Sequence, residues 1–167
     1  MRLTETIKKW LTENGMSEQP EINDDVSGSS THIKYRVGDF IVPLFMDADE
    51  EKELFQIYAY FGEPMIPQKR IDESKRFIHE LNSGIVRLGV FQLADEDRSL
   101  RYYNAIDVEK ASFETAHIAN MVSAGLDYME YVLPKHMAIC FSEVTIEEVF
   151  SAGSNQNNGL DYKVRIH

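Results

Sequence analysis

The chain has 167 residues, 43% of them hydrophobic, and its 17 basic and 28 acidic side chains give a formal net charge of −11. This length and composition fit one globular domain and exclude disorder along the whole chain. The acidity, with no large cluster of Lys and Arg, argues against nucleic acid and anionic membranes as partners. A single cysteine, Cys140, excludes an intramolecular disulfide and suits a reducing compartment, so we expect a cytoplasmic protein.

The N-terminal segment has the pattern of an amphipathic helix over residues 4–14. Leu3, Ile7 and Trp10 recur there at helical spacing. This pattern differs from that of a signal peptide, and no apolar run in the chain approaches the about 20 residues of a membrane span. A polar loop rich in Asp, Ser and Gly follows, with room for a short strand around residues 21–26.

Three strands forming an antiparallel meander are expected next, over residues 32–37, 40–46 and 54–61. The first alternates polar and apolar residues, as a half-buried strand does. The second is nearly all apolar, but Pro43 cannot donate to a ladder and favours an edge or a bulge at that point. The acidic segment 47–52 is interpreted as the solvated turn between the second and third strands.

The second half of the domain is predicted to contain a helix, two strands and a long helix. Pro67 suits the first turn of a helix over residues 68–82. A fourth strand over 85–93 and a fifth over 100–108 form a hairpin. A broad apolar stripe indicates a helix over 114–133, which the following proline should end or kink.

The remaining residues divide into a further helix and a tail. Residues 137–150 have a helical pattern, and residues 151–167 are rich in Ser, Asn and Gly, which is typical of a flexible tail. We therefore expect a single domain over residues 1–150. Its order, α-β-β-β-α-β-β-α, predicts an α+β fold with an antiparallel sheet of about five strands and helices packed on one face.

The sequence contains none of the common catalytic or cofactor-binding motifs. P-loop, dinucleotide-binding, nucleophile-elbow, zinc-protease and EF-hand patterns are all missing. Cys140 stands among apolar residues and is expected to be an inert core thiol. We predict no enzyme activity, no catalytic residue, no cofactor and no metal. The alternative is an enzyme or ligand-binding domain with a site that has no motif, for which His117, Glu114 and Asp107 would have to converge.

Aromatic residues on the strands suggest a binding surface. A sheet covered by helices on one side leaves its other face open, and aromatic residues there would form an interaction patch. Both faces of the third strand are apolar or aromatic, and two tyrosines stand side by side in the fifth. The candidate protein-binding patch is Tyr58, Tyr60, Tyr102 and Tyr103. The alternative, that these aromatic residues point into the core, stays open.

The order of the elements resembles that of a known bacterial family. The matching features are the apolar segment 40–44 after a tight turn, a helix that opens at Pro67 and ends at residues 81–82, a strand pair from Ile85, and a long helix from about Phe113. Together they resemble the YbjN family, whose fold is similar to that of the type III secretion chaperones.

This resemblance covers residues 3–133 and implies a general role without assigning residues to it. Chaperones of this fold are small, acidic, cytoplasmic and usually dimeric, and they bind extended segments of a partner protein. The resemblance therefore implies a protein-binding module, chaperone-like or regulatory, that acts on another protein and forms a homodimer.

Overall fold

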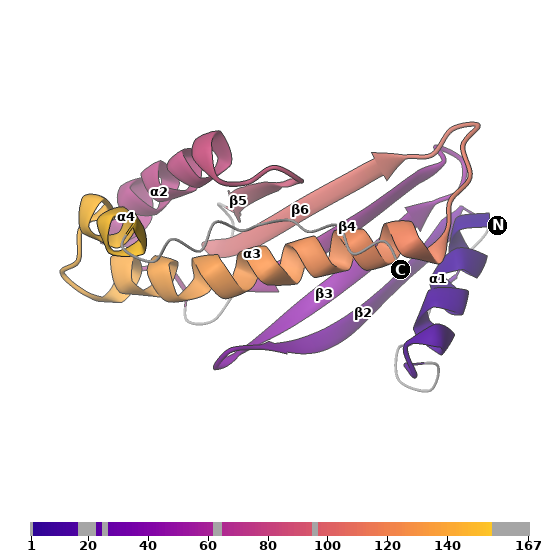
Figure 1. The fold of residues 1–167 in the computed structure, drawn as a ribbon, viewed down its shortest axis with the longest axis horizontal. Helices are drawn as coiled ribbons and strands as arrows, with labels where there is room; N and C mark the ends of the chain where they lie inside the picture. Colours follow the sequence, from indigo (N-terminus) through magenta and orange to yellow (C-terminus); the bar gives the residue numbers. More distant parts are fainter. Residues whose placement is uncertain (1, 17–22, 25–26, 62–64, 95–96, 155–167) are drawn as a thin grey trace.

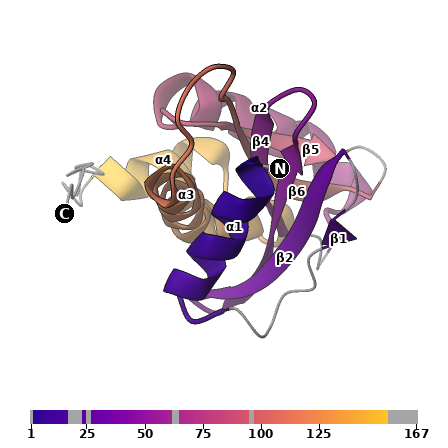
Figure 2. The ribbon, with the colours of Figure 1, turned by 90° about the vertical axis from the view of Figure 1, so that its right-hand side faces the viewer.

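The computed structural model describes residues 2–16, 23–24, 27–61, 65–94 and 97–154, and these form two layers. One layer is an antiparallel β-sheet, and the long helix α3 (Thr115–Phe141) crosses one of its faces (Figure 1). In Figure 2 the helices α1 (Arg2–Glu13), α3 and α4 (Ile146–Ser154) lie to one side of the sheet. The prediction of an α+β fold with helices on one face of an antiparallel sheet is confirmed.

The sheet has six strands in the order β1-β2-β3-β4-β6-β5, and all neighbours are antiparallel. Five strands correspond to predicted ones, and a two-residue strand, β1, stands where the sequence left room for one. The bounds are β1 Asn23–Asp24, β2 Gly28–Val37, β3 Phe40–Asp49, β4 Leu54–Phe61, β5 Val90–Ala94 and β6 Ser99–Asp107.

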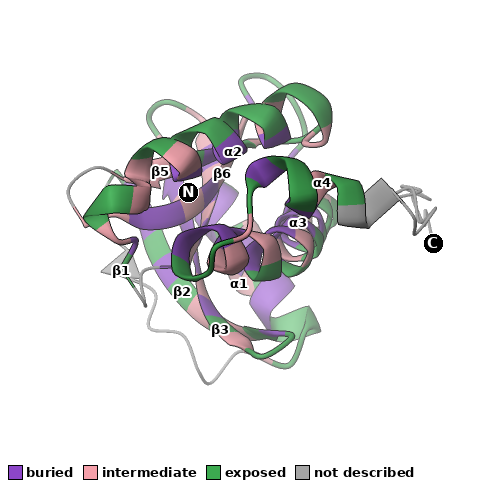
Figure 3. Ribbon diagram, turned by 90° about the vertical axis from the view of Figure 1, so that its left-hand side faces the viewer, coloured by how far each residue is buried: buried purple, intermediate pink, exposed green. Residues whose placement is uncertain are grey.

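The core lies between the sheet and the helices. Figure 3 shows buried residues on the inner sides of the helices and alternating along the strands. The helix α1 contributes the apolar stripe that the sequence predicted, and α3 contributes a longer one. The helix α2 (Ile71–Gly84), which follows a short 3-10 turn over Gln68–Arg70, packs beside β5 at one end of the sheet.

The fourth strand is shorter than predicted, because residues 85 and 86 close the end of α2 and residues 88–89 form a bend. The backbone N–H groups of Ile85 and Val86 both donate to the carbonyl of Leu81. Gly89 then turns the chain with a φ of 74°, a conformation that glycine adopts without strain. Strand β5 therefore begins at Val90 and not at residue 85.

Pro134 was predicted to end or kink the long helix. The helix does not end there, so that part of the prediction is wrong: α3 continues to Phe141. The ring of Pro134 is exposed to solvent, while Val132, Leu133 and His136 around it are buried. Burial on the inner face of the helix offsets the one backbone hydrogen bond that a proline removes.

The predicted helix over residues 137–150 is therefore divided between α3 and α4. Helix α4 begins after Thr145, whose hydroxyl accepts from the N–H of Glu148 while the Glu148 carboxylate accepts from the N–H of Thr145. This reciprocal capping is a strong helix start. Helix α4 extends to Ser154, and the rest of the expected tail lies outside the described residues. None of the described helices combines the length and the hydropathy that crossing a bilayer requires.

Candidate functional site

The face of the sheet turned away from the helices, which we call the open face, carries partly exposed aromatic side chains. Along β4, every second residue from Phe55 to Phe61 is buried. Tyr58 and Tyr60 alternate with these and are half-buried on the other side, as the sequence predicted. Strand β3 alternates in the same way, and on β6 Leu100 and Tyr102 are buried while Arg101 and Tyr103 are partly exposed.

The strand register aligns one side chain from each of five strands into a row across the open face. Phe45 pairs with Tyr58, Tyr58 with Tyr103, and Tyr103 with Val90 on the edge strand. On the other side, Phe45 pairs with His32. The rings of His32 and Phe45 stack with centroids 5.4 Å apart, and those of Tyr58 and Tyr103 lie 5.1 Å apart. We call His32, Phe45, Tyr58, Tyr103 and Val90 the aromatic row.

Arg101 and Tyr60 extend this row along the strands. They pair directly between β4 and β6, and the Arg101 guanidinium lies 5.7 Å from the ring centroid of Tyr60 and 5.8 Å from that of Tyr58. At such distances a cation is attracted to the face of an aromatic ring. The Tyr60 hydroxyl donates to the carboxylate of Asp97. These contacts hold the rings in fixed positions.

The same residues border a solvent-open depression of about 450 Å³. Its size falls in the range of roughly 300–1,000 Å³ that is typical of ligand pockets. The lining residues are Ser30, Phe45, Asp47, Tyr58, Tyr60, Asp97 and Arg101.

Three side chains that line the depression have shifted pKa values. Burial, the nearby Tyr103 and the Asp47 carboxylate raise the pKa of Tyr58. The hydrogen bond to Asp97 raises the pKa of Tyr60, and hydrogen bonds from Ser99 and Tyr60 lower the pKa of Asp97. The tyrosines therefore stay protonated and Asp97 stays ionised, which suits recognition by apolar contact and hydrogen bonding.

Tyr102 does not belong to this surface, so that part of the predicted patch is wrong. Its side chain is fully buried, and its hydroxyl donates to the carbonyl of Leu88 at 2.7 Å. The ring packs against Phe91 and Tyr128, and burial raises the pKa of the hydroxyl. Neighbouring residues of a strand point to opposite faces, so Tyr102 and Tyr103 cannot share one.

The residues of the catalytic alternative are engaged in local contacts. The ring Nδ1 of His117 accepts from the N–H of Glu114 at 3.0 Å, which caps the start of α3. The Asp107 carboxylate accepts from the N–H of Glu109 at 2.9 Å. These contacts give each group a structural role, and the convergence expected for an active site gains no support from them.

A buried polar cluster between α2 and α3 was missed by the sequence analysis. Ser74 Oγ lies 2.7 Å from His136 Nε2, and Cys140 Sγ lies 3.6 Å from the same nitrogen. All three side chains are buried. Burial lowers the pKa of His136 to about 4 and raises that of Cys140 to about 11. Both groups are neutral at pH 7, so the cluster holds no reactive thiolate.

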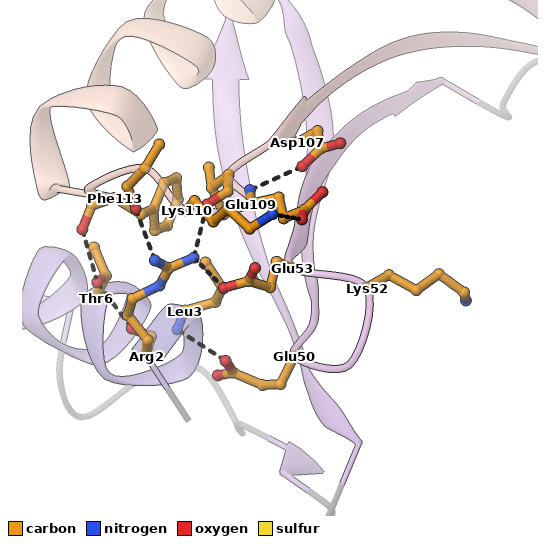
Figure 4. A network of polar contacts seen from close by, with 12 residues as sticks. Arg2, Leu3, Thr6, Glu50, Lys52, Glu53, Asp107, Glu109, Lys110 and Phe113 are labelled. Carbon is orange, nitrogen blue, oxygen red and sulfur yellow. Dashed lines mark hydrogen bonds and ion pairs between the residues drawn. The ribbon is translucent and has the colours of Figure 1, made fainter.

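The acidic turn between β3 and β4 holds α1 in place (Figure 4). The Glu50 carboxylate accepts from the N–H groups of Leu3 and Thr4, at 3.2 and 2.8 Å. Arg2 donates to Glu53 and to the carbonyls that precede α3. This turn is therefore more than the solvated loop expected from the sequence.

Within the described ranges, no group of three or more His, Cys, Asp or Glu side chains is placed to hold a metal ion.

Comparison with known proteins identifies no family for this chain. No protein-family model matches it, and no curated protein matches it in sequence. Among solved structures it is similar to a chain of the ExsC–ExsE complex, with 15% sequence identity and a TM-score of 0.49 over 78% of this chain and 93% of that one. Membership of the YbjN family stays a prediction.

Proposed function

We propose that this chain is a non-catalytic protein-binding module, chaperone-like or regulatory, which holds a segment of another protein on the aromatic row. The observation that carries the proposal is the alignment of apolar side chains from neighbouring strands into one continuous row. Such a row is rigid before binding, because each side chain stands on a hydrogen-bonded strand.

The composition of the row suits the centre of a protein interface. Tyr and Phe are enriched there because they bury a large area with few rotatable bonds. Val90, which is 38% exposed, ends the row at the β5 edge. Partial exposure of several apolar groups in one line is what a partner segment would cover.

Two further features of the proposal come from the resemblance to the YbjN family and the type III secretion chaperones. These are a cytoplasmic location and a homodimer. The alternative of a small-ligand site draws on the depression of about 450 Å³ beside the row. The same surface residues would serve both functions, so the identity of the bound molecule distinguishes them.

The test compares two double variants in affinity capture from host lysate with quantitative mass spectrometry. Tyr58→Ser/Tyr103→Ser removes two rings from the aromatic row. Met65→Ser/Phe141→Ser removes two apolar side chains that are 48% and 47% exposed outside the row. We expect a stoichiometric protein partner to be lost by the first variant and kept by the second, with both variants folded by circular dichroism. Undiminished capture by the first variant would contradict the proposal.

A further inference from the structure

The charged residues of the open face are separated into two groups by the aromatic row. On strands β2 to β6, alternation places six charged side chains on this face. The three acidic ones stand on one side of the row and the three basic ones on the other. They are Asp47, Asp49 and Asp107, and Lys34, Arg36 and Arg101.

The strand directions produce this separation. From His32 in the row, β2 runs to Lys34 and Arg36 near the β2–β3 turn. From Phe45, the antiparallel β3 runs the opposite way, to its two aspartates near the β3–β4 turn. Strand β6 carries a charge of each sign on the matching sides of Tyr103. The open face is therefore acidic at one end, apolar in the middle and basic at the other.

The basic charges are available to a partner. Lys34 and Arg36 are exposed, and within the described part of the chain neither forms an ion pair. Asp97 also lies near the basic end, but its carboxylate already accepts from Tyr60 and Ser99. At the acidic end, Asp47 accepts a hydrogen bond from Ser30 at 2.6 Å, and Asp49 forms an ion pair with Lys52 at 2.7 Å.

The row lies on the face of the sheet and not at its edge, which favours a helix over a strand as the bound segment. A strand laid on the face of a sheet would bury its own backbone N–H and C=O groups without partners. A helix satisfies these groups internally. His32 and Phe45 are paired, so from Arg36 to His32 and on from Phe45 to Asp49 the face spans eight residue-to-residue steps, about 26 Å at roughly 3.3 Å per step. That length matches a helix of about 18 residues.

We propose that the bound segment is an amphipathic helix of opposite charge at its two ends. Its apolar middle covers the aromatic row, its basic end lies over Asp47, Asp49 and Asp107, and its acidic end lies over Lys34, Arg36 and Arg101. This inference rests on the proposed function, namely that the row binds a protein segment. Charge complementarity of this kind selects between partners that share an apolar face.

The net charge of the whole chain would select a different helix from the one selected by the charges of the open face. The test therefore compares binding of the two kinds of helix. A net charge of −11 acting as a whole would favour a uniformly basic helix. Three synthetic peptides of about 18 residues with one shared apolar face serve as probes. One is basic at one end and acidic at the other, one is basic throughout, and one is acidic throughout.

The measurement is fluorescence anisotropy of each labelled peptide with the full chain, at about 150 mM salt. The bipolar peptide should bind about fivefold tighter than the basic one, as expected for a few exposed ion pairs. Lys34→Glu/Arg36→Glu should reverse this order in favour of the basic peptide. The control Lys9→Glu/Lys69→Glu changes the net charge equally, away from the open face, and should preserve the order.

The remaining outcomes show whether the bipolar helix alone fails or whether the proposed function of the aromatic row fails with it. Tightest binding of the basic peptide to the unmodified chain, or an order that Lys34→Glu/Arg36→Glu does not change, overturns the bipolar helix. In either of these cases, loss of peptide binding in Tyr58→Ser/Tyr103→Ser would show that the aromatic row binds the peptide, and the proposed function would be kept. If no peptide binds, or if binding survives loss of the two tyrosines, both proposals are overturned.

Discussion

Gly125 of α3 lies directly against the ring of Tyr102 on β6. A Cβ atom at position 125 would stand 2.9 Å from Cε1 and 3.1 Å from Cδ1 of that ring. The ring is buried and its hydroxyl is hydrogen-bonded to the carbonyl of Leu88, so it has little freedom to move. This contact sets how closely the long helix approaches the sheet.

Gly125→Ala is therefore expected to destabilise the protein, although alanine is the better helix former by about 1 kcal/mol. Overpacking of a full core costs about 1–3 kcal/mol, which exceeds that gain. The matched control is Gly84→Ala at the end of α2, where nothing lies within 4 Å of the added methyl group. Urea denaturation of both variants decides the point, and a more stable Gly125→Ala protein would show that the ring can yield.

His136 should make the stability of the protein depend on pH in the acid range. Burial lowers its pKa to about 4 in the folded protein, against about 6.5 in the unfolded chain. Between these values only the unfolded chain binds the proton, so stability falls as the pH falls from 6.5 to 4, by up to about 3 kcal/mol. Above about pH 7 this contribution is constant.

The measurement is the free energy of unfolding from pH 4 to 8 for the unmodified protein and for His136→Gln. The variant removes the titrating ring and keeps a polar partner for Ser74. We expect its stability to change less with pH below 6.5. His79→Gln, on the exposed side of α2, should leave the slope unchanged. Equal slopes in all three proteins would refute this role of His136.

Asn82 closes the outer edge of the sheet at β5. Its side-chain amide donates to the carbonyl of Phe91 at 2.9 Å and accepts from the N–H of the same residue at 2.8 Å. These two bonds take the place of a neighbouring strand. An open edge can pair with another chain, so Asn82 protects the sheet against association along β5.

Asn82→Ala should cost about 1–3 kcal/mol, because it leaves two partly buried backbone groups without partners. It should also give larger species in sedimentation velocity as the protein concentration rises. Ser83→Ala, one residue further along α2, should do neither, since that hydroxyl bonds only within its own helix. A stable Asn82→Ala protein with unchanged sedimentation would remove the proposed protection.

Glu50 should anchor the N-terminal helix. Burial opposes its ionisation, but the hydrogen bonds from the N–H groups of Thr4 and Leu3 prevail, and its pKa lies below the ordinary value. Loss of a carboxylate that caps a helix costs about 0.5–2 kcal/mol. We expect faster amide exchange throughout α1 in Glu50→Ala and no change in Glu51→Ala, whose side chain is exposed. Unchanged exchange in α1 would show that other contacts suffice.

The order of the elements was predictable because each has its own periodicity. On β4, the alternation of Ile57 and Ala59 with Tyr58 and Tyr60 was enough to assign both faces. The limits of α3 were not predictable in this way. Pro134 is a local signal for a helix end, and it was overridden by burial of the residues around it.

The aromatic row needed information that a single sequence does not contain. Phe45, Tyr103 and Val90 come together only through the register of four strands, which is set by contacts between distant residues. Period-2 alternation alone would have separated Tyr102 from Tyr103. The start of α4 could also have been read from Thr145 and Glu148, whose spacing is that of a capping box.

The central claim is that the open face, through the aromatic row, contacts another protein. The most direct test places a photo-cross-linking amino acid at Tyr103 in one protein and at Phe141, an exposed position outside the row, in another. Each protein is irradiated in its host cells, and the adducts are identified by mass spectrometry. The account predicts a defined protein adduct from position 103 and none from position 141. An adduct from position 141 alone, or no adduct from position 103 in cells where a partner is captured, would contradict it.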